Sequence, residues 1–139
     1  MDAREFLGAV YKNDKMVKNK IFERNYWRDL AVSVSTYSDG DRVQSSSNPQ
    51  RKTDAMNTCI DMQSEIDAAI AQLADHFRSV TAVIEQLPAD EYDVLHMRYI
   101  QHLTNNEVAD VLGKGTSYAS DLHTNGVKNV QRILDGGQQ

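Results

Sequence analysis

The chain has few of the residues that interrupt helices or crosslink a fold. Its 139 residues include one cysteine, two prolines and seven glycines. The lone Cys59 excludes a disulfide within the chain and is typical of a reducing compartment such as the cytoplasm. Because proline breaks helices and only Pro49 and Pro88 occur, long stretches are free to be helical. The sequence therefore favours an all-α fold.

Long apolar runs are also missing. No stretch of about 18 consecutive apolar residues occurs, so we expect no membrane-spanning helix. The first residues, MDAREFLGAVYKNDK, lack the apolar core and small-residue cleavage site of a signal peptide. Apolar residues make up 40% of the chain and charged residues 25%, as in soluble globular proteins. We therefore expect a cytoplasmic protein with no membrane partner.

The residue patterns of enzymes and metal sites are absent as well. No glycine-rich loop of the kind that holds phosphates occurs. Asp90, Glu91 and Asp93 fall in the expected first turn of a helix, where carboxylates are favourable without any catalytic role. The histidines lack metal-ligand spacing, so we expect neither catalysis nor a cofactor or metal. The four histidines, which we expect to be exposed or half-buried, are His76, His96, His102 and His123.

The net charge of −5 is distributed unevenly. Residues 1–53 hold ten Lys and Arg against seven Asp and Glu, and residues 54–95 hold one against nine. Residues 96–139 hold four of each, so the last third is neutral and the acidic total does not exclude nucleic acid there. The clearly basic face that most DNA-binding proteins carry is nevertheless missing.

Two long helices are expected in the first part of the chain. Asp2 with Glu5 predicts a capping box, which opens a helix running to about Val34. Residues 37–53 are rich in Ser, Asp and Asn and predict a loop or linker between the two helices. A second helix is expected to begin at Asp54. Residues 1–86 would then form a long helical hairpin, and residues 87–139 a second domain.

Apolar residues of the second helix recur at alternating intervals of three and four. This heptad pattern predicts left-handed packing against another helix. The first helix, folded back antiparallel, is favoured because it is basic and the second helix is acidic. A second copy of the chain is the alternative partner, and the polar Gln63 is then suited to fixing its register. The expected seam consists of Met56, Cys59, Gln63, Ile66, Ile70, Leu73, Phe77, Val80, Ile84 and Leu87.

Two short helices around a glycine are expected near the C-terminus. Thr104 and Glu107 match a capping box that starts the first of them. Its inner face is predicted to contain Val108, Ala109 and Leu112. Gly113 suits the left-handed conformation that ends a helix, and Thr116 or Ser117 is expected to cap the next one. This order of capped helix, glycine turn and second helix predicts a helix-turn-helix.

The second of these helices is expected to bury Ala119, Leu122, Gly126, Val130 and Ile133, although a glycine inside a helix costs about 1 kcal/mol. Its outer face would then meet DNA. Hydroxyl groups can hydrogen-bond base edges or phosphates, a carboxylate can accept from a cytosine amine, and cations can contact phosphates. The candidate DNA-binding residues, which include the capping Thr104 and the turn, are Thr104, Lys114, Thr116, Ser117, Tyr118, Ser120, Asp121, Thr124, Lys128 and Arg132.

Several residue pairs of the last part of the chain carry a resemblance to a known family. They are Leu87–Pro88, Val94–Leu95, Arg98–Tyr99, Leu103–Thr104, Val108–Ala109 and Leu112–Gly113. From Leu87 onward the chain resembles the C-terminal region of bacterial sigma factors, which reads the −35 promoter element. With the stretches YWRDLAVSVSTYSDGDRVQSSS and LPADEYDVLHMRYIQHLTNNEVADVL, the whole chain resembles small phage and prophage proteins of Gram-positive bacteria, related to the ArpU and RinA type of late-gene transcription regulators.

The resemblance implies a phage transcription regulator in a bacterial cytoplasm, with double-stranded DNA as its partner and the hairpin as a means of homodimerisation or of docking on RNA polymerase. Sigma-type recognition helices usually start with Arg or Lys, whereas this one starts with Ser117, Tyr118 and Ser120. Two alternatives therefore stay open. One is a helical protein–protein interaction module without DNA binding. The other is a phage packaging protein similar to small terminase subunits.

Overall fold

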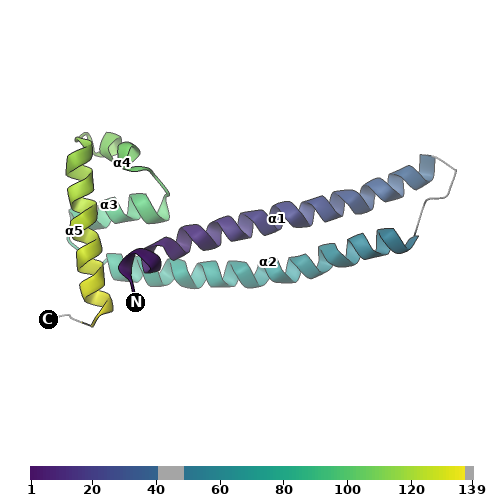
Figure 1. The fold of residues 1–139 in the computed structure, drawn as a ribbon, viewed down its shortest axis with the longest axis horizontal. Helices are drawn as coiled ribbons and strands as arrows, with labels where there is room; N and C mark the ends of the chain where they lie inside the picture. The colour runs from purple at the N-terminus through teal and green to yellow at the C-terminus, as the bar shows by residue number, and fades with distance from the viewer. Residues whose placement is uncertain (41–48, 137–139) are drawn as a thin grey trace. The chain divides into compact units, whose positions relative to one another are not determined.

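The computed structural model contains helices and no strand among the residues that it describes, which are 1–40 and 49–136 for the backbone and 1–33 and 49–136 for the side chains. The all-α expectation is therefore confirmed. The elements are α1 (Ala3–Gly40), α2 (Pro49–Ile84), α3 (Ala89–Leu95), the π-helical turn η1 (His96–Ile100), α4 (Asn105–Leu112) and α5 (Thr116–Leu134) (Figure 1).

Backbone contacts divide the chain into two compact units. Unit 1 combines residues 1–13 with residues 72–139, and unit 2, here called the distal hairpin, comprises residues 14–71. The long helices α1 and α2 thus contribute to both units. The expected division between residues 86 and 87 stays a prediction.

Both long helices extend further than the sequence predicted. The Glu5 backbone N–H donates to Asp2 Oδ2 over 3.0 Å, which is one of the two hydrogen bonds of the expected capping box. However, α1 continues past Val34 to Gly40, and α2 begins at Pro49 rather than at Asp54. Proline suits the first position of a helix, since the N–H that it lacks has no partner there.

The predicted loop over residues 37–53 is correspondingly too long. Residues 37–40 and 49–53 are helical. The remaining residues 41–48, which include the expected anchors Arg42, Val43 and Gln44, lie outside the described part of the chain.

In the distal hairpin, α1 and α2 pack antiparallel, as the heptad pattern predicted. Lys20 Nζ lies 3.0 Å from Glu65 Oε1, and an Arg24 guanidinium N–H donates to Gln63 Oε1. The ion pair joins the basic helix to the acidic one, as their charges predicted. Buried apolar side chains between the helices include Val17, Met62 and Ile66.

The buried seam of α2 agrees with the predicted one at some positions and differs at others. Ile66, Val80, Ile84 and Leu87 are buried as predicted. Met56, Ile70 and Phe77 are exposed, so the prediction was wrong at these three positions. The side chains that are buried instead lie one residue earlier, for example Ala55 and Ala69. Apolar residues on α2 form two adjacent stripes with the same spacing, and the pattern alone does not tell which of them the partner helix covers.

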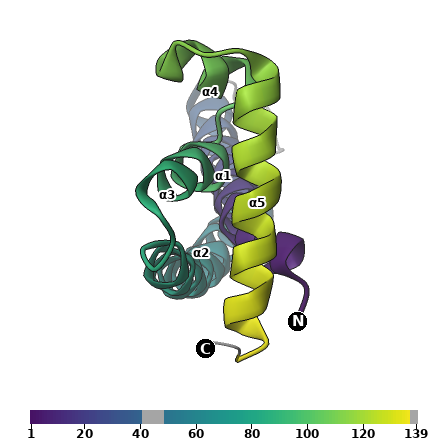
Figure 2. The ribbon, with the colours of Figure 1, turned by 90° about the vertical axis from the view of Figure 1, so that its left-hand side faces the viewer.

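Unit 1 has a core to which four of its helices contribute. This core consists of Ala3, Leu7, Val10, Val80, Ile84, Leu87, Leu95, Val127 and Val130. Helix α5 packs against both α3 and α4, and the N-terminus of the chain lies beside its C-terminal half (Figure 2). No helix in the described part of the chain is long and apolar enough to cross a membrane.

Candidate nucleic-acid interface

Helix α4 starts with the capping box that the sequence predicted. The Glu107 backbone N–H donates to Thr104 Oγ1 over 3.2 Å, and the Thr104 backbone N–H donates to Glu107 Oε1 over 2.8 Å. Two of the N–H groups that a helix start leaves without partners are satisfied in this way. The start of α4 is therefore fixed by its own side chains.

The turn between α4 and α5 depends on Gly113. This residue has φ 68° and ψ 31°, the left-handed conformation that glycine adopts without steric cost. The Lys114 backbone N–H then donates to Ala109 O over 3.0 Å. Helix α5 begins after Gly115, which is its N-cap, so the expectation that Thr116 or Ser117 provides the cap was wrong.

A side chain of α4 bridges the turn. Asn105 Nδ2 donates to the backbone oxygen of Thr116 over 3.3 Å, so it joins the first turn of α4 to the first turn of α5. Beneath the turn, Ala119 is fully buried in a second core cluster with Val108 and Ala109. The inner face predicted for α4 and the start of α5 is confirmed by this burial.

Farther along α5, a histidine is buried that the sequence analysis placed at the surface or half-buried. His123 is only 7% exposed, and its Nε2 lies 2.7 Å from the Tyr99 hydroxyl oxygen. Burial, with the nearby positive charges of Arg98 and Arg4, lowers the pKa of His123 to about 4. The imidazole is therefore neutral at physiological pH, and it joins α5 to η1 through a hydrogen bond.

Gly126 explains how closely α5 approaches α3. A Cβ atom at this position would lie 3.1 Å from Leu95 Cγ and from Leu95 Cδ1. Leu95 itself is fully buried. The glycine therefore permits a close helix contact, in which an added Cβ would require the Leu95 side chain to shift by a few tenths of an ångström.

The opposite face of α5 is open to solvent. All ten residues that the sequence analysis selected are exposed, and they lie in α5, in the turn and at the start of α4. Their exposure is necessary for contact with DNA, although their role in binding stays a prediction. These residues are Thr104, Lys114, Thr116, Ser117, Tyr118, Ser120, Asp121, Thr124, Lys128 and Arg132.

Some of the ten have polar groups that are already engaged. The Thr104 hydroxyl caps α4. Arg132 Nη1 donates to Asn129 Oδ1 over 2.7 Å, and Asn129 Nδ2 in turn donates to Glu91 Oε1 over 2.6 Å. Lys114 Nζ lies 5.4 Å from the centre of the Tyr118 ring, within the range of a cation–π contact.

The sequence analysis missed Asn125, which is also exposed, next to Thr124 and one turn after Asp121. Its spacing could have identified it, because Asn125 is four residues from Asp121 and therefore shares that residue's face of the helix.

The sequence analysis also missed Gln131, which joins the N-terminus of the chain to α5. Gln131 Oε1 accepts from the Ala3 backbone N–H and Nε2 donates to Met1 O, each over 2.8 Å. No spacing rule predicts a contact between residues so far apart in the sequence.

A shallow groove of about 370 Å³ lies on another side of unit 1. Val111, at its edge on α4, is 65% exposed. In the described part of the chain, no cluster of three or more His, Cys, Asp or Glu side chains is arranged to hold a metal ion. The groove is lined by Tyr92, Asp93, His96, Met97, Gln101, Val111 and Leu112.

Comparison with protein families identifies the segment that contains this interface. Residues 83–132 match the family model described as sigma-70, region 4. The match spans α3, η1, α4 and most of α5, and so it supports a DNA-binding helix-turn-helix. Comparisons with curated proteins and with solved structures gave no match.

Proposed function

We propose that this chain is a transcription regulator that binds double-stranded DNA with α5 as its recognition helix. The observation that carries the proposal is the contrast between the two faces of α5 within the segment that matches sigma-70 region 4. The inner face is fixed by Ala119, His123 and Gly126, whereas the outer face presents polar side chains to solvent.

The dimensions of α5 suit the major groove. Its 19 residues give a length of about 28 Å, and the groove is about 12 Å wide. In a helix-turn-helix, the N-terminal residues of the recognition helix contact base edges. This places Ser117, Ser120 and Asp121 at the bases, with the Asp121 carboxylate suited to accept from a cytosine amine.

The cations of the interface are placed to contact phosphates. Lys114 lies in the turn before α5, and Lys128 lies 14 residues further along, on the exposed face of α5. Neither makes an ion pair with another residue in the described part of the chain. The two charges are therefore available to phosphate oxygens. Because these cations are few, we expect binding by a single copy to be weak and sensitive to salt.

The test is a binding measurement on the full chain. Duplexes selected from a random pool are labelled, and their affinity is measured by fluorescence anisotropy at low salt. Changing Lys114 or Lys128 to Ala removes a phosphate contact, so each variant should weaken binding several-fold and by similar factors across duplex sequences. Asp121→Ala should instead relax the base preference at one position of the selected site.

The control is Lys12→Ala, which removes an exposed cation from α1 and should leave the affinity unchanged. If no duplex binds at low salt, or if Lys12→Ala weakens binding as much as Lys128→Ala, the assignment of α5 as the recognition helix is wrong.

The resemblance to regulators of the ArpU and RinA type extends the proposal to phage or prophage genes in a bacterial cytoplasm. The hairpin formed by α1 and α2 then serves to dimerise the protein, or to dock it on RNA polymerase. Dimerisation has the stronger physical argument, since a second copy doubles the number of cations at the DNA.

The groove beside Val111 favours a second candidate, a protein-interaction module that uses the same fold. The lining of the groove includes Tyr92, Met97 and Leu112 beside Val111, so apolar surface from more than one residue is open to another protein. This candidate predicts that Val111→Asp abolishes co-purification of a partner while Lys114→Ala and Lys128→Ala have no effect on any function of the protein.

A further inference from the structure

We propose that a second copy of this chain packs antiparallel on one face of the distal hairpin, about a two-fold axis near Phe22. The inference rests on the proposed role of the hairpin in dimerisation and assigns the surface that performs it. The surface, here called the apolar face, consists of Phe22, Val32, Met56, Ile60 and Ile70.

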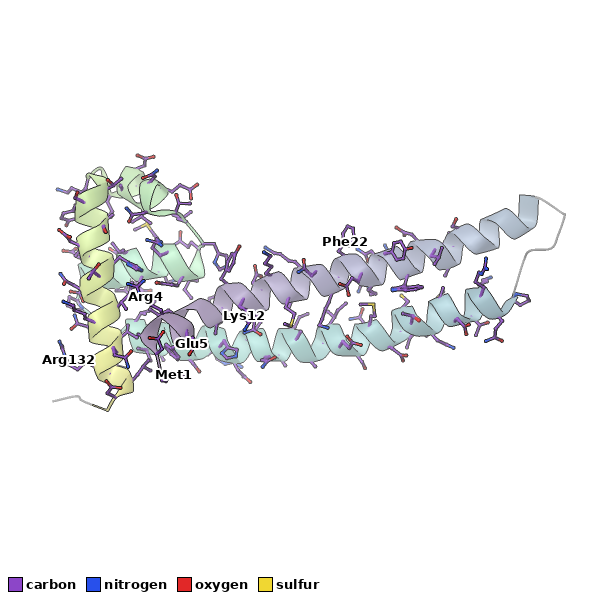
Figure 3. All side chains as sticks on the ribbon, viewed as in Figure 1. Met1, Arg4, Glu5, Lys12, Phe22 and Arg132 are labelled. Atoms are coloured by element: carbon purple, nitrogen blue, oxygen red, sulfur yellow. The ribbon has the colours of Figure 1, made fainter. Side chains whose placement is uncertain are left out.

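The distal hairpin exposes more large apolar side chains than it buries. Its buried apolar residues are Val17, Ala31, Ala55, Met62, Ile66 and Ala69, and three of these are alanine. By contrast, Phe22 is 74% exposed and Ile60 is 61% exposed. Figure 3 shows Phe22 on the side of α1 that faces away from α2. So small a core leaves most of the large apolar side chains of the distal hairpin available to a partner.

Most of the exposed large apolar residues of the distal hairpin lie on one side of the helix pair, and Met16 and Tyr26 are the others. In an antiparallel pair, residues that directly follow the buried positions lie on one side, and residues that directly precede them lie on the other. Met56 follows the buried Ala55, and Ile70 follows the buried Ala69. Val32 follows the buried Ala31 in α1. These three residues therefore share a side.

The other side of the pair is polar. Lys20 and Glu65, which form the ion pair between the helices, directly precede Ile21 and the buried Ile66. The Lys20–Glu65 ion pair therefore places two charged groups on that side of the helix pair. Met16, which directly precedes the buried Val17, is the exposed apolar residue of that side, at 42%. The larger exposed apolar surface of the distal hairpin is therefore the apolar face.

Charge on the apolar face indicates that the occupant is another copy. Lys15 and Asp29 lie at equal distances of seven residues on either side of Phe22, so they share its face of α1 and carry opposite charges. Lys15 makes no ion pair within the described residues. An antiparallel second copy centred on Phe22 brings Lys15 of each chain beside Asp29 of the other.

The same axis also pairs the apolar residues of α2. Met56 and Ile70 lie seven residues on either side of Gln63. The hydrogen bond between Arg24 and Gln63 places Gln63 close to the level of Phe22 along the hairpin. A two-fold axis at that level therefore pairs Met56 with Ile70 of the second copy. A single two-fold axis therefore pairs Lys15 with Asp29 and Met56 with Ile70 between the two copies.

The experiment is sedimentation equilibrium of the full chain over a range of concentrations. The wild type should have twice the monomer mass of 15.7 kDa. Lys15→Glu and Asp29→Lys should each weaken the dimer about tenfold, because like charges then meet twice across the two-fold axis. The double variant Lys15→Glu/Asp29→Lys should restore the wild-type dissociation constant.

Two further variants keep the test decisive. Glu23→Lys reverses a charge on an exposed residue outside the apolar face and should leave the dimer unchanged. Phe22→Ser removes an exposed side chain, so it should give a monomer with undiminished helical circular dichroism. DNA binding by the recognition helix is measured separately, so a failure of dimerisation is distinguishable from a failure of the proposed function.

A wild type that stays monomeric would overturn the proposal, and so would a mass corresponding to a ring of many subunits. Failure of the double variant to recover would overturn the antiparallel arrangement.

Discussion

At the scale of single residues, Gly126 shows how a missing side chain sets the distance between two helices. Its position in the interior of α5 is unfavourable for the helix itself, by about 1 kcal/mol relative to alanine. The structure gives the compensation, since Leu95 of α3 fills the space that a side chain would need. The glycine is therefore a packing requirement of the helix-turn-helix.

We expect Gly126→Ala to destabilise the protein by about 1 kcal/mol, since overpacking a fully buried neighbour costs about 1–3 kcal/mol and exceeds the gain in helix propensity. The matched control is Gly8→Ala in α1, where an added Cβ would meet nothing within 4 Å. Gly8→Ala should therefore stabilise the protein by about 0.5–1 kcal/mol. Urea denaturation of both variants measures the difference. Changes of equal sign would contradict this account of Gly126.

At the scale of helices, the sequence predicted the elements better than their faces. The capping box at Thr104 and the glycine turn at Gly113 are local patterns, and both are present. The seam of α2 was misplaced at Met56, Ile70 and Phe77, because heptad spacing fits the stripe through Ala55 as well as the stripe through Met56. Alanine gives a weak hydrophobic signal, yet it is the residue that permits close helix packing. The stripe that is buried is the one that α1 covers, and the α2 sequence alone does not indicate which stripe this is.

Contacts across long sequence distances explain the other differences. His123 is buried because Tyr99 lies beneath it and hydrogen-bonds its imidazole. Gln131 holds the N-terminus because Met1 and Ala3 lie beside it. Neither partner is recognisable from spacing along α5. The outer face of α5, by contrast, follows from helical periodicity and was predicted residue by residue, apart from Asn125.

The difference from the predicted seam has a measurable consequence in unit 1. Ile84 is fully buried, whereas Phe77 is 42% exposed, although the heptad pattern placed both in the same seam. We therefore expect Ile84→Ala to cost about 2–5 kcal/mol of stability and Phe77→Ala about 1 kcal/mol or less. Urea denaturation again provides the comparison. A larger loss for Phe77→Ala would restore the seam that the sequence suggested.

At the scale of the whole molecule, a net charge of −5 must be reconciled with binding to a polyanion. The excess of acidic residues lies in residues 54–95, which hold nine Asp and Glu against one Arg. The exposed face of α5 with its turn carries Lys114, Lys128 and Arg132 against Asp121. Local charge, and not the total, decides attraction within a Debye length of about 10 Å. The proposed dimer would carry two such faces.

We expect the salt dependence of DNA binding to show that a dimer makes twice as many phosphate contacts as a single copy. Three phosphate contacts give a slope of log affinity against log salt of about −3 for one copy and about −5 for two. Anisotropy titrations between about 50 and about 200 mM salt should therefore give a steeper slope for the wild type than for Phe22→Ser. Equal slopes for the two proteins would mean that a single copy binds each DNA site.

The division into two units has a consequence for how chains of this kind vary. Residues 14–71, the distal hairpin, are inserted in sequence between the two segments of unit 1, which are residues 1–13 and 72–139. A matched insertion or deletion of one heptad in both arms preserves every inward-facing position. Hairpin length is thus free to change while the recognition surface stays intact, so relatives of this chain should differ in length chiefly by paired heptads between the two arms.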